Sequence, residues 1–262
     1  MEFSTNVSVT GEVLRGPEPP EFSSVDEERE FRKHRLALAF RMFADWGFED
    51  GAAGHITVRD PENLDQFWVN PFCFPFSQIT TDDLVLVDHA GAIVRGRHPI
   101  NTAAFAIHSE LHRNRPEVVA AAHSHSTYGK AFSTQGRLLQ PISQDACAFY
   151  KSHGLFDDYT GIVFSNDEGK RIAHALDDYK AVILRNHGLV TVGESVDSAV
   201  WWYVAMDRAC HVQLLADSAG TPVEIDPDEA RKTNEQVGAE HSGWLSAQPM
   251  FADAERIYGH LV

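Results

Sequence analysis

The stretch Val118-Val-Ala-Ala-Ala-His-Ser-His-Ser126 joins an apolar run to two histidines. An unbroken apolar run of this length is typical of a strand buried on both faces of a sheet. Residues two apart in a strand point to the same face, so His123 and His125 can reach one point from a rigid backbone. We therefore predict a buried strand over 118–122 that ends in two candidate metal ligands, followed by a helix from about residue 126 to 132.

A second apolar run, Ala181-Val-Ile-Leu184, leads into Arg185-Asn-His-Gly188 and a further strand over 189–192. Gly188 allows a tight turn beside His187. Neutral imidazole is the commonest protein ligand for metals, and three such ligands leave a coordination position open, as in catalytic sites. The pattern favours one divalent ion, zinc, manganese or iron, on His123, His125 and His187. Chance remains an alternative on spacing alone, because the chain has 14 histidines.

The rest of the chain alternates helical and strand-like segments. Helices are predicted over 24–47, 102–114 and 195–218, the first with a capping-box pattern at Ser24 and Glu27 and the last capped by Ser195. Strands are predicted over 55–59, 66–69 and 84–87, whereas the two prolines in 70–76 exclude a central strand. Residues 1–22 indicate a flexible arm, and 23–262 a single α/β domain.

Composition limits the partners. The net charge of -16 argues against nucleic acid and anionic membranes, because phosphates would be repelled. A small anionic substrate stays possible, since a bound cation can reverse the local field. Three cysteines without a CxxC pair suggest a reducing compartment, and neither a signal pattern nor an apolar run of membrane-spanning length is visible. We expect a cytoplasmic protein.

Three segments resemble the class II aldolase/adducin family: Gly54-His-Ile-Thr-Val-Arg59, Val119 to Ser126, and Leu184-Arg-Asn-His-Gly-Leu-Val-Thr-Val-Gly193. Their order and spacing match the family from about residue 30 to 220. The resemblance implies a three-layer α/β/α fold around a central, mainly antiparallel sheet. It also implies a homotetramer with active sites between subunits, and it places His123, His125 and His187 on the family's metal ligands.

The departures from the family's sugar-phosphate aldolases argue against a phosphorylated substrate. At the places that hold the phosphate there, this chain has bulky or apolar groups, which would strip a dianion of water without replacing its hydrogen bonds. The aldolases' catalytic glutamate falls on Ala104, while His108 keeps a family histidine. Near the place of their catalytic tyrosine, contributed by a neighbouring subunit, this chain has Gln144 and Asp145, which are candidates for the lost acid/base. The phosphate-site replacements are His55, Phe72, Cys73, Asn101 and Thr102.

Three functions follow from the resemblance. The first is a metal-dependent carbon–carbon lyase, a decarboxylase or an aldol-type enzyme, for an aromatic oxo acid or carboxylate. The second is a non-haem Fe(II) oxygenase acting on a prenylated arylpyruvate or arylglycolate, as in aminocoumarin pathways. The third is a non-catalytic, adducin-like scaffold. For an enzyme, we predict His55 and His108 as catalytic groups with Gln144 and Asp145. The predicted pocket residues are Phe72, Cys73, Phe74, Asn101, Thr102, Phe149 and Tyr150.

Overall fold

The computed structural model describes residues 5–7, 13–162 and 166–262. At its centre is an eight-stranded sheet whose neighbouring strands are antiparallel, except for the parallel pair β8–β9. This confirms the predicted α/β fold with a mainly antiparallel sheet. In spatial order the strands are β6 (Ile93–Arg95), β5 (Val85–Asp88), β4 (Gln66–Val69), β3 (His55–Arg59), β7 (Ala120–Ser124), β10 (Gly188–Gly193), β9 (Ala181–Leu184) and β8 (His153–Phe156).

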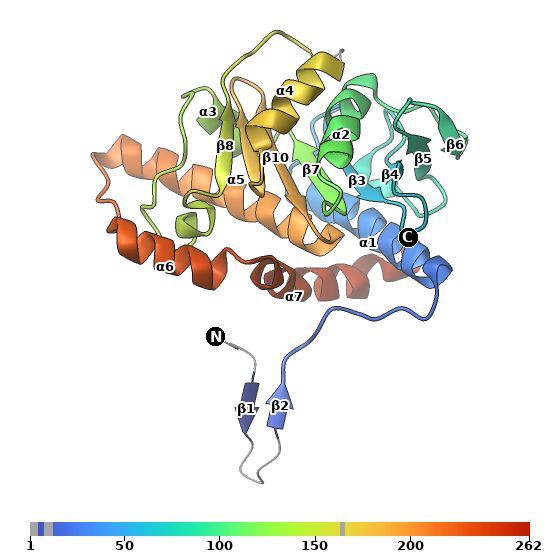
Figure 1. Ribbon diagram of the computed structural model, residues 1–262, viewed down its shortest axis with the longest axis horizontal. Coiled ribbons are helices and arrows are strands. Elements are labelled where there is room, and N and C mark those ends of the chain that lie inside the picture. The colour runs from blue at the N-terminus through green and yellow to red at the C-terminus, as the bar shows by residue number, and fades with distance from the viewer. Residues whose placement is uncertain (1–4, 8–12, 163–165) are drawn as a thin grey trace.

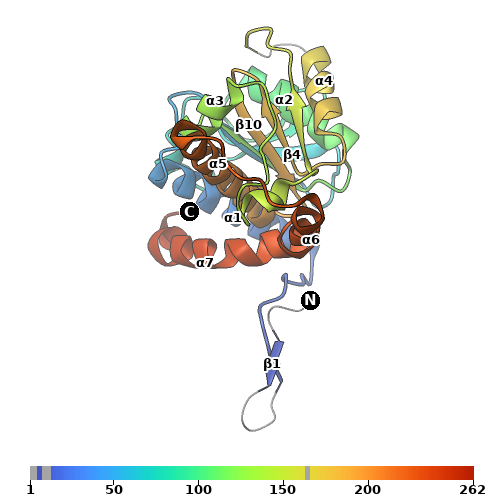
Figure 2. The same ribbon diagram turned by 90° about the vertical axis from the view of Figure 1, so that its left-hand side faces the viewer.

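Helices cover both faces of this sheet, as Figures 1 and 2 show. One face carries α2 (Thr102–Asn114) and α4 (Asn166–Leu176); the other carries α1 (Val25–Asp45), α5 (Val196–Ala219) and α7 (Glu240–Tyr258). Apolar side chains along each strand point alternately to the two helical layers. Val182, for example, packs in the cluster under α2 and α4, and the next residue, Ile183, packs in the cluster under α1 and α5. The three-layer α/β/α arrangement is therefore confirmed.

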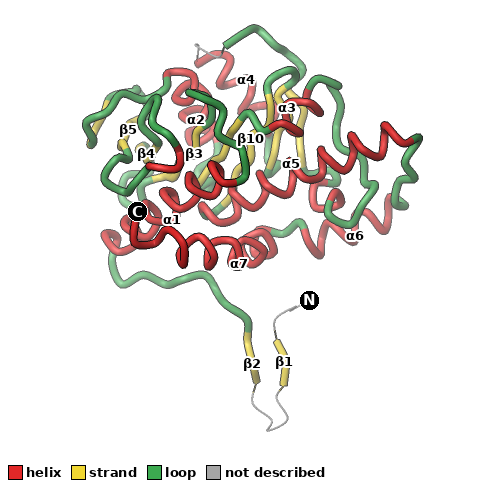
Figure 3. The backbone as a smooth tube through the Cα atoms, turned by 180° about the vertical axis from the view of Figure 1, so that it is seen from behind, coloured by secondary structure: helices red, strands yellow, loops and turns green. Residues whose placement is uncertain are grey.

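Shorter elements complete the chain. They are the helices α3 (Thr127–Ser133) and α6 (Pro227–Val237) and the 3-10 turns η1 (Phe76–Gln78), η2 (Ala146–Phe149) and η3 (Gly259–Leu261). A small hairpin of β1 (Thr5–Val7) and β2 (Val13–Arg15) lies outside the main body (Figure 3). Residues 1–4 and 8–12 of the expected arm lie outside the described residues. Among the helices described, none is both long and apolar enough to cross a membrane.

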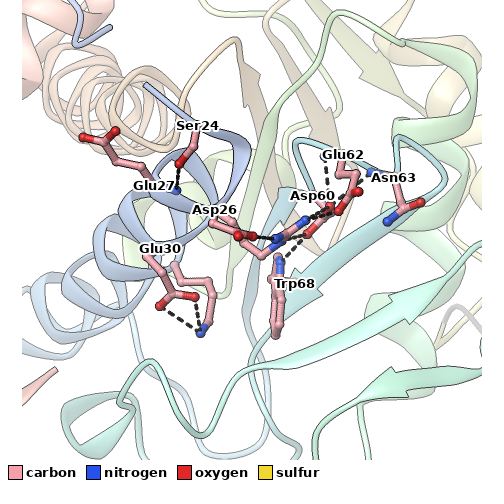
Figure 4. Close-up of polar contacts among 10 residues, drawn as sticks. Ser24, Asp26, Glu27, Glu30, Asp60, Glu62, Asn63 and Trp68 are labelled. Carbon is pink, nitrogen blue, oxygen red and sulfur yellow. Dashed lines mark hydrogen bonds and ion pairs between the residues drawn. The ribbon is translucent and has the colours of Figure 1, made fainter. Parts of the chain in front are cut away.

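Helix α1 is fixed to the sheet by the buried carboxylate of Asp60, which follows β3 (Figure 4). This carboxylate accepts hydrogen bonds from Arg29 Nε at 2.7 Å and Trp68 Nε1 at 3.2 Å. It also accepts from the backbone amides of Glu62 at 3.0 Å and Asn63 at 3.1 Å. Burial alone would raise the pKa of Asp60, but these donors hold it below its ordinary value. The ionised carboxylate of Asp60 thus connects α1, β3 and β4 through hydrogen bonds.

Most predicted elements are present, with instructive shifts. The buried strand lies over Ala120–Ser124 rather than 118–122, because the Val118 amide closes a turn onto the Arg115 carbonyl. Ser24 caps α1 by accepting from the Glu27 amide at 3.2 Å, as predicted. The Glu27 carboxylate, however, returns to Ser23 instead of Ser24.

A candidate metal centre and its pocket

Three neighbouring strands bring the predicted ligands to one edge of the sheet. Strands β3, β7 and β10 are adjacent and antiparallel, so β3 and β10 begin where β7 ends (Figure 1). His55 lies directly opposite His123 in the register. His125 follows β7 by one residue, and His187 immediately precedes β10. Segments far apart in sequence thus place four imidazoles together.

The side chains of His123, His125 and His187 converge as a metal site requires. One ligand atom from each lies within 4.8 Å of the others, and the Nε2 atoms of His125 and His187 are 3.1 Å apart. His123 directs Nδ1 at the Leu189 carbonyl, 2.8 Å away. Because a carbonyl only accepts, Nδ1 carries the proton and Nε2 is left free for a ligand.

Burial keeps these imidazoles in the form that binds metals. It is the main cause that lowers the pKa of all three, and it brings that of His187 to about 4. Proximity of the rings acts in the same direction for His123 and His187, and Lys130 does so for His125. Three neutral nitrogen donors fit one divalent ion with open positions.

The three histidines of the centre line a cavity of about 460 Å³. Phe72, Tyr159 and Ile162 lie at this cavity although they are 40%, 50% and 66% exposed. Exposed apolar groups gathered around one cavity mark a binding site for an apolar partner. The full lining is Ala52, Ala53, Gly54, His55, Phe72, Asn101, Ala103, Ile107, His123, His125, Lys130, Tyr159, Gly161, Ile162, Asn186 and His187.

Only some of the predicted site residues lie in this lining. His55, Phe72 and Asn101 do, and Asn101 also caps α2 by accepting from the Ala103 amide at 2.9 Å. His108 lies behind His55, with Nε2 at 2.7 Å from His55 Nδ1. Thr102 begins α2 beside the pocket without lining it.

The remaining predicted pocket residues lie elsewhere. Phe149 is wholly buried and packs on Trp202, so its assignment to a pocket wall of this chain is wrong: its ring fills the core. Phe74 packs against His98 instead of facing the cavity. Cys73 does not line the cavity either. The same holds for the predicted residues next to η2, of which Gln144 and Asp145 are exposed and Tyr150 is half-buried.

The structure also adds residues that sequence reasoning missed. Lys130, on α3, lines the cavity, and its ammonium group pairs with Asp50 at 2.5 Å. Lys130 follows His125 by five residues, and this closeness in sequence to a predicted ligand could have marked it as a candidate site residue. Tyr159 and Ile162 belong to a loop with no periodicity, so no pattern marked them.

The profile described as "Class II Aldolase and Adducin N-terminal domain" matches residues 34–214. The chain belongs to this family. It is 52% identical to the "Decarboxylase NovR" of Streptomyces niveus over 89% of this chain and 87% of that protein. It is 51% identical to a "4-hydroxy-3-prenylphenylpyruvate oxygenase/4-hydroxy-3-prenylbenzoate synthase" of Streptomyces roseochromogenus, over 88% and 84%.

A solved structure of the class II aldolase/adducin family is also similar. It is named "L-fuculose 1-phosphate aldolase from Glaciozyma antarctica PI12" and has 46% sequence identity. The TM-score is 0.87, over 93% of this chain and 96% of that one. Members of the family thus carry names for different reactions, so the reaction of this chain has to be inferred from the residues of its pocket.

Proposed function

We propose that the protein is a metal-dependent enzyme that removes the carboxylate of a non-phosphorylated, aromatic 2-oxo acid, with dioxygen as co-substrate. The observation that carries this proposal is a three-histidine centre that opens into a cavity with aromatic walls. The names of the two Streptomyces relatives, a decarboxylase and a phenylpyruvate oxygenase, agree with it. A bound ion would hold the carboxylate and the 2-oxo group and polarise them.

The chain's own residues match such a substrate. Phe72, Tyr159 and Ile162 offer apolar surface for an aromatic ring. Lys130, although paired with Asp50, places a cation beside the cavity for a substrate carboxylate in a chain of net charge -16. The cavity of about 460 Å³ has the size that one drug-sized molecule fills.

A sugar phosphate fits the same pocket poorly. Among the described lining residues there is no arginine, serine or threonine, and Lys130 is the one permanent cation. A phosphate dianion beside Phe72 would lose its hydration without enough donors to replace it. The aldolase activity for which the Glaciozyma protein is named is therefore not expected of this chain.

The proposed reaction balances with one molecule of dioxygen per turnover. The 2-oxo acid loses its carboxylate carbon as carbon dioxide. One oxygen atom enters the new carboxylate, and the other hydroxylates the neighbouring carbon, so no external reductant is needed. A second candidate is decarboxylation without dioxygen, which is favoured by the name of the NovR relative, a decarboxylase with no oxygenase in its name.

Oxygen and carbon dioxide measurements decide between the two. Protein purified without chelator or affinity metal is analysed for metals, reloaded with Fe(II) or Zn(II), and given phenylpyruvate. Equal uptake of oxygen and release of carbon dioxide by the iron form supports the proposal. Release without uptake supports the second candidate. Cleavage of L-fuculose 1-phosphate with no turnover of phenylpyruvate would contradict both.

We infer further that the working form is a homotetramer with its active sites between subunits. The family's members are oligomeric. Gln144 and Asp145 are exposed and do not line their own cavity, so they are free to approach that of a neighbouring subunit. Light scattering gives the mass in solution. Loss of activity in Asp145→Asn, regained by mixing with His187→Ala chains, would support a shared site; no regain in a mixed tetramer would contradict it.

A further inference from the structure

The segment 124–129, which carries His125, leaves the sheet before it reaches the metal centre. His125 lies one residue beyond the end of β7, so no strand pairing fixes its backbone. Its imidazole contacts Nε2 of His187, and the described residues offer it no other hydrogen bond. His123, by contrast, lies within β7, and the Leu189 carbonyl orients its ring. The position of His125 therefore depends on what holds the segment around it.

Tyr203 of α5 holds this segment at both neighbours of His125. Its phenol donates a hydrogen bond to the Ser124 carbonyl at 2.7 Å and lies 3.0 Å from Ser126 Oγ. Burial raises the pKa of Tyr203, so the phenol keeps the proton that it donates. The ring is fully buried and packs on Phe43 with the centroids 5.0 Å apart, which gives the phenol a fixed place.

Asp207 holds the other end of the same segment. It follows Tyr203 by four residues on α5, so the two side chains lie on one face of the helix. Its buried carboxylate accepts a hydrogen bond from the Gly129 amide at 2.8 Å. A Cβ on Gly129 would lie 2.7 Å from Ser126 Oγ, so the absence of a side chain lets the segment turn this closely. Helix α5 thus binds the backbone on both sides of His125.

We propose that Tyr203 and Asp207 are positioning residues of the metal centre, which hold His125 where it can share one ion with the two other ligands. Neither side chain lines the cavity, so both act through the backbone of the segment rather than on the ion or the substrate. Contacts behind a metal ligand commonly change the affinity for the metal by about ten- to a hundredfold. This inference rests on the metal centre of the proposed function.

Binding of Co(II) to the metal-free full chain tests the proposal, because the visible absorption of Co(II) reports the arrangement of its ligands as well as their affinity. Tyr203→Phe removes the hydroxyl and keeps the ring. It should weaken Co(II) binding about tenfold and change the spectrum. Asp207→Ala should have the same effect. Asp207→Asn keeps an acceptor for the Gly129 amide, so it should restore the native affinity and spectrum.

Two other buried groups provide matched controls. The Thr191 hydroxyl donates to the Ala199 carbonyl at 2.8 Å, so Thr191→Val also removes a buried hydroxyl from a backbone carbonyl. Asp197 is a buried carboxylate in the first turn of α5, beyond the end of β10 that lies away from the centre, and it accepts from Gln248 at 3.0 Å. Thr191→Val and Asp197→Ala should both keep the native Co(II) affinity and spectrum. Urea unfolding of every variant measures how much stability each change costs.

The outcomes separate a positioning role from a merely structural one. Weaker binding and an altered spectrum in Tyr203→Phe and Asp207→Ala, but not in the two controls, support the proposal. Native affinity and spectrum in both variants would overturn it. Equal losses of affinity in the controls would also overturn it, since binding would then follow the stability of the fold. A native chain that binds no Co(II) would refute the metal centre of the proposed function, and this inference with it.

Discussion

Acid should destabilise this protein through a buried histidine far from the metal centre. His153, in β8, is 4% exposed and accepts a hydrogen bond on Nε2 from the Leu139 amide at 3.0 Å. Its Nδ1 donates to the Phe149 carbonyl at 2.6 Å. A proton on Nε2 would face another N–H group, so the folded chain resists protonation, and burial lowers the pKa of His153 to about 4.

The folded and unfolded chains therefore differ in proton uptake. The unfolded imidazole has a pKa of 6.5, so between pH 6.5 and 4 it takes up a proton that the folded one does not. The free energy of unfolding falls as the pH falls through this window and is unaffected above it. At about 1.4 kcal/mol per pH unit, the loss from His153 is about 2 kcal/mol at pH 5 and about 3 kcal/mol at pH 4.

Urea unfolding of the metal-free chain at pH 7.5 and pH 5 measures this effect. His153→Gln keeps one donor and one acceptor but cannot take up a proton, so it should lose about 2 kcal/mol less between the two pH values than the native chain. The exposed His174, changed to Gln, is the control and should behave like the native chain. An equal loss in His153→Gln and the native chain would refute the reasoning.

Four further substitutions test other parts of the structure. His187→Ala should abolish tight metal binding, measured by elemental analysis after dialysis. Phe72→Ala should weaken phenylpyruvate binding about tenfold through lost apolar contact, measured by calorimetry of the zinc form. Asp60→Asn should lower the free energy of unfolding by about 2–4 kcal/mol, measured in urea, because it leaves buried donors poorly matched. Gly54→Ala should cost about 1–2 kcal/mol in the same assay, since φ is +94° and a Cβ would lie 3.1 Å from Phe76.

The central part of the sheet could be predicted because its strands are apolar on both faces. The runs before His123 and His187 have no other stable place than the middle of a sheet, and the ligands follow from the strand ends. Caps at Ser24 and Ser195 fixed two helix starts in the same local way. These features depend on neighbours in sequence, which is why sequence alone shows them.

Features that depend on distant packing were not predictable. Phe149 follows Gln144 and Asp145 closely, yet it turns into the core while they stay exposed. The helices over 227–237 and 240–258 were not predicted; the first packs against η2 and the second against α5. The contacts of His108 with His55 and Thr57 depend on how α2 packs against β3, which the sequence of neither element shows.

The position of the centre at the junction of β3, β7 and β10 bears on how the chain folds. His187 is separated from His123 and His125 by α3, η2, β8, α4 and β9, so no short segment of a nascent chain contains all three ligands. Contacts of such long range form late, after the costly closure of the loops between them. The metal-free chain must therefore form its native sheet without help from the ion, and the rate of metal binding during refolding would report the last step of folding.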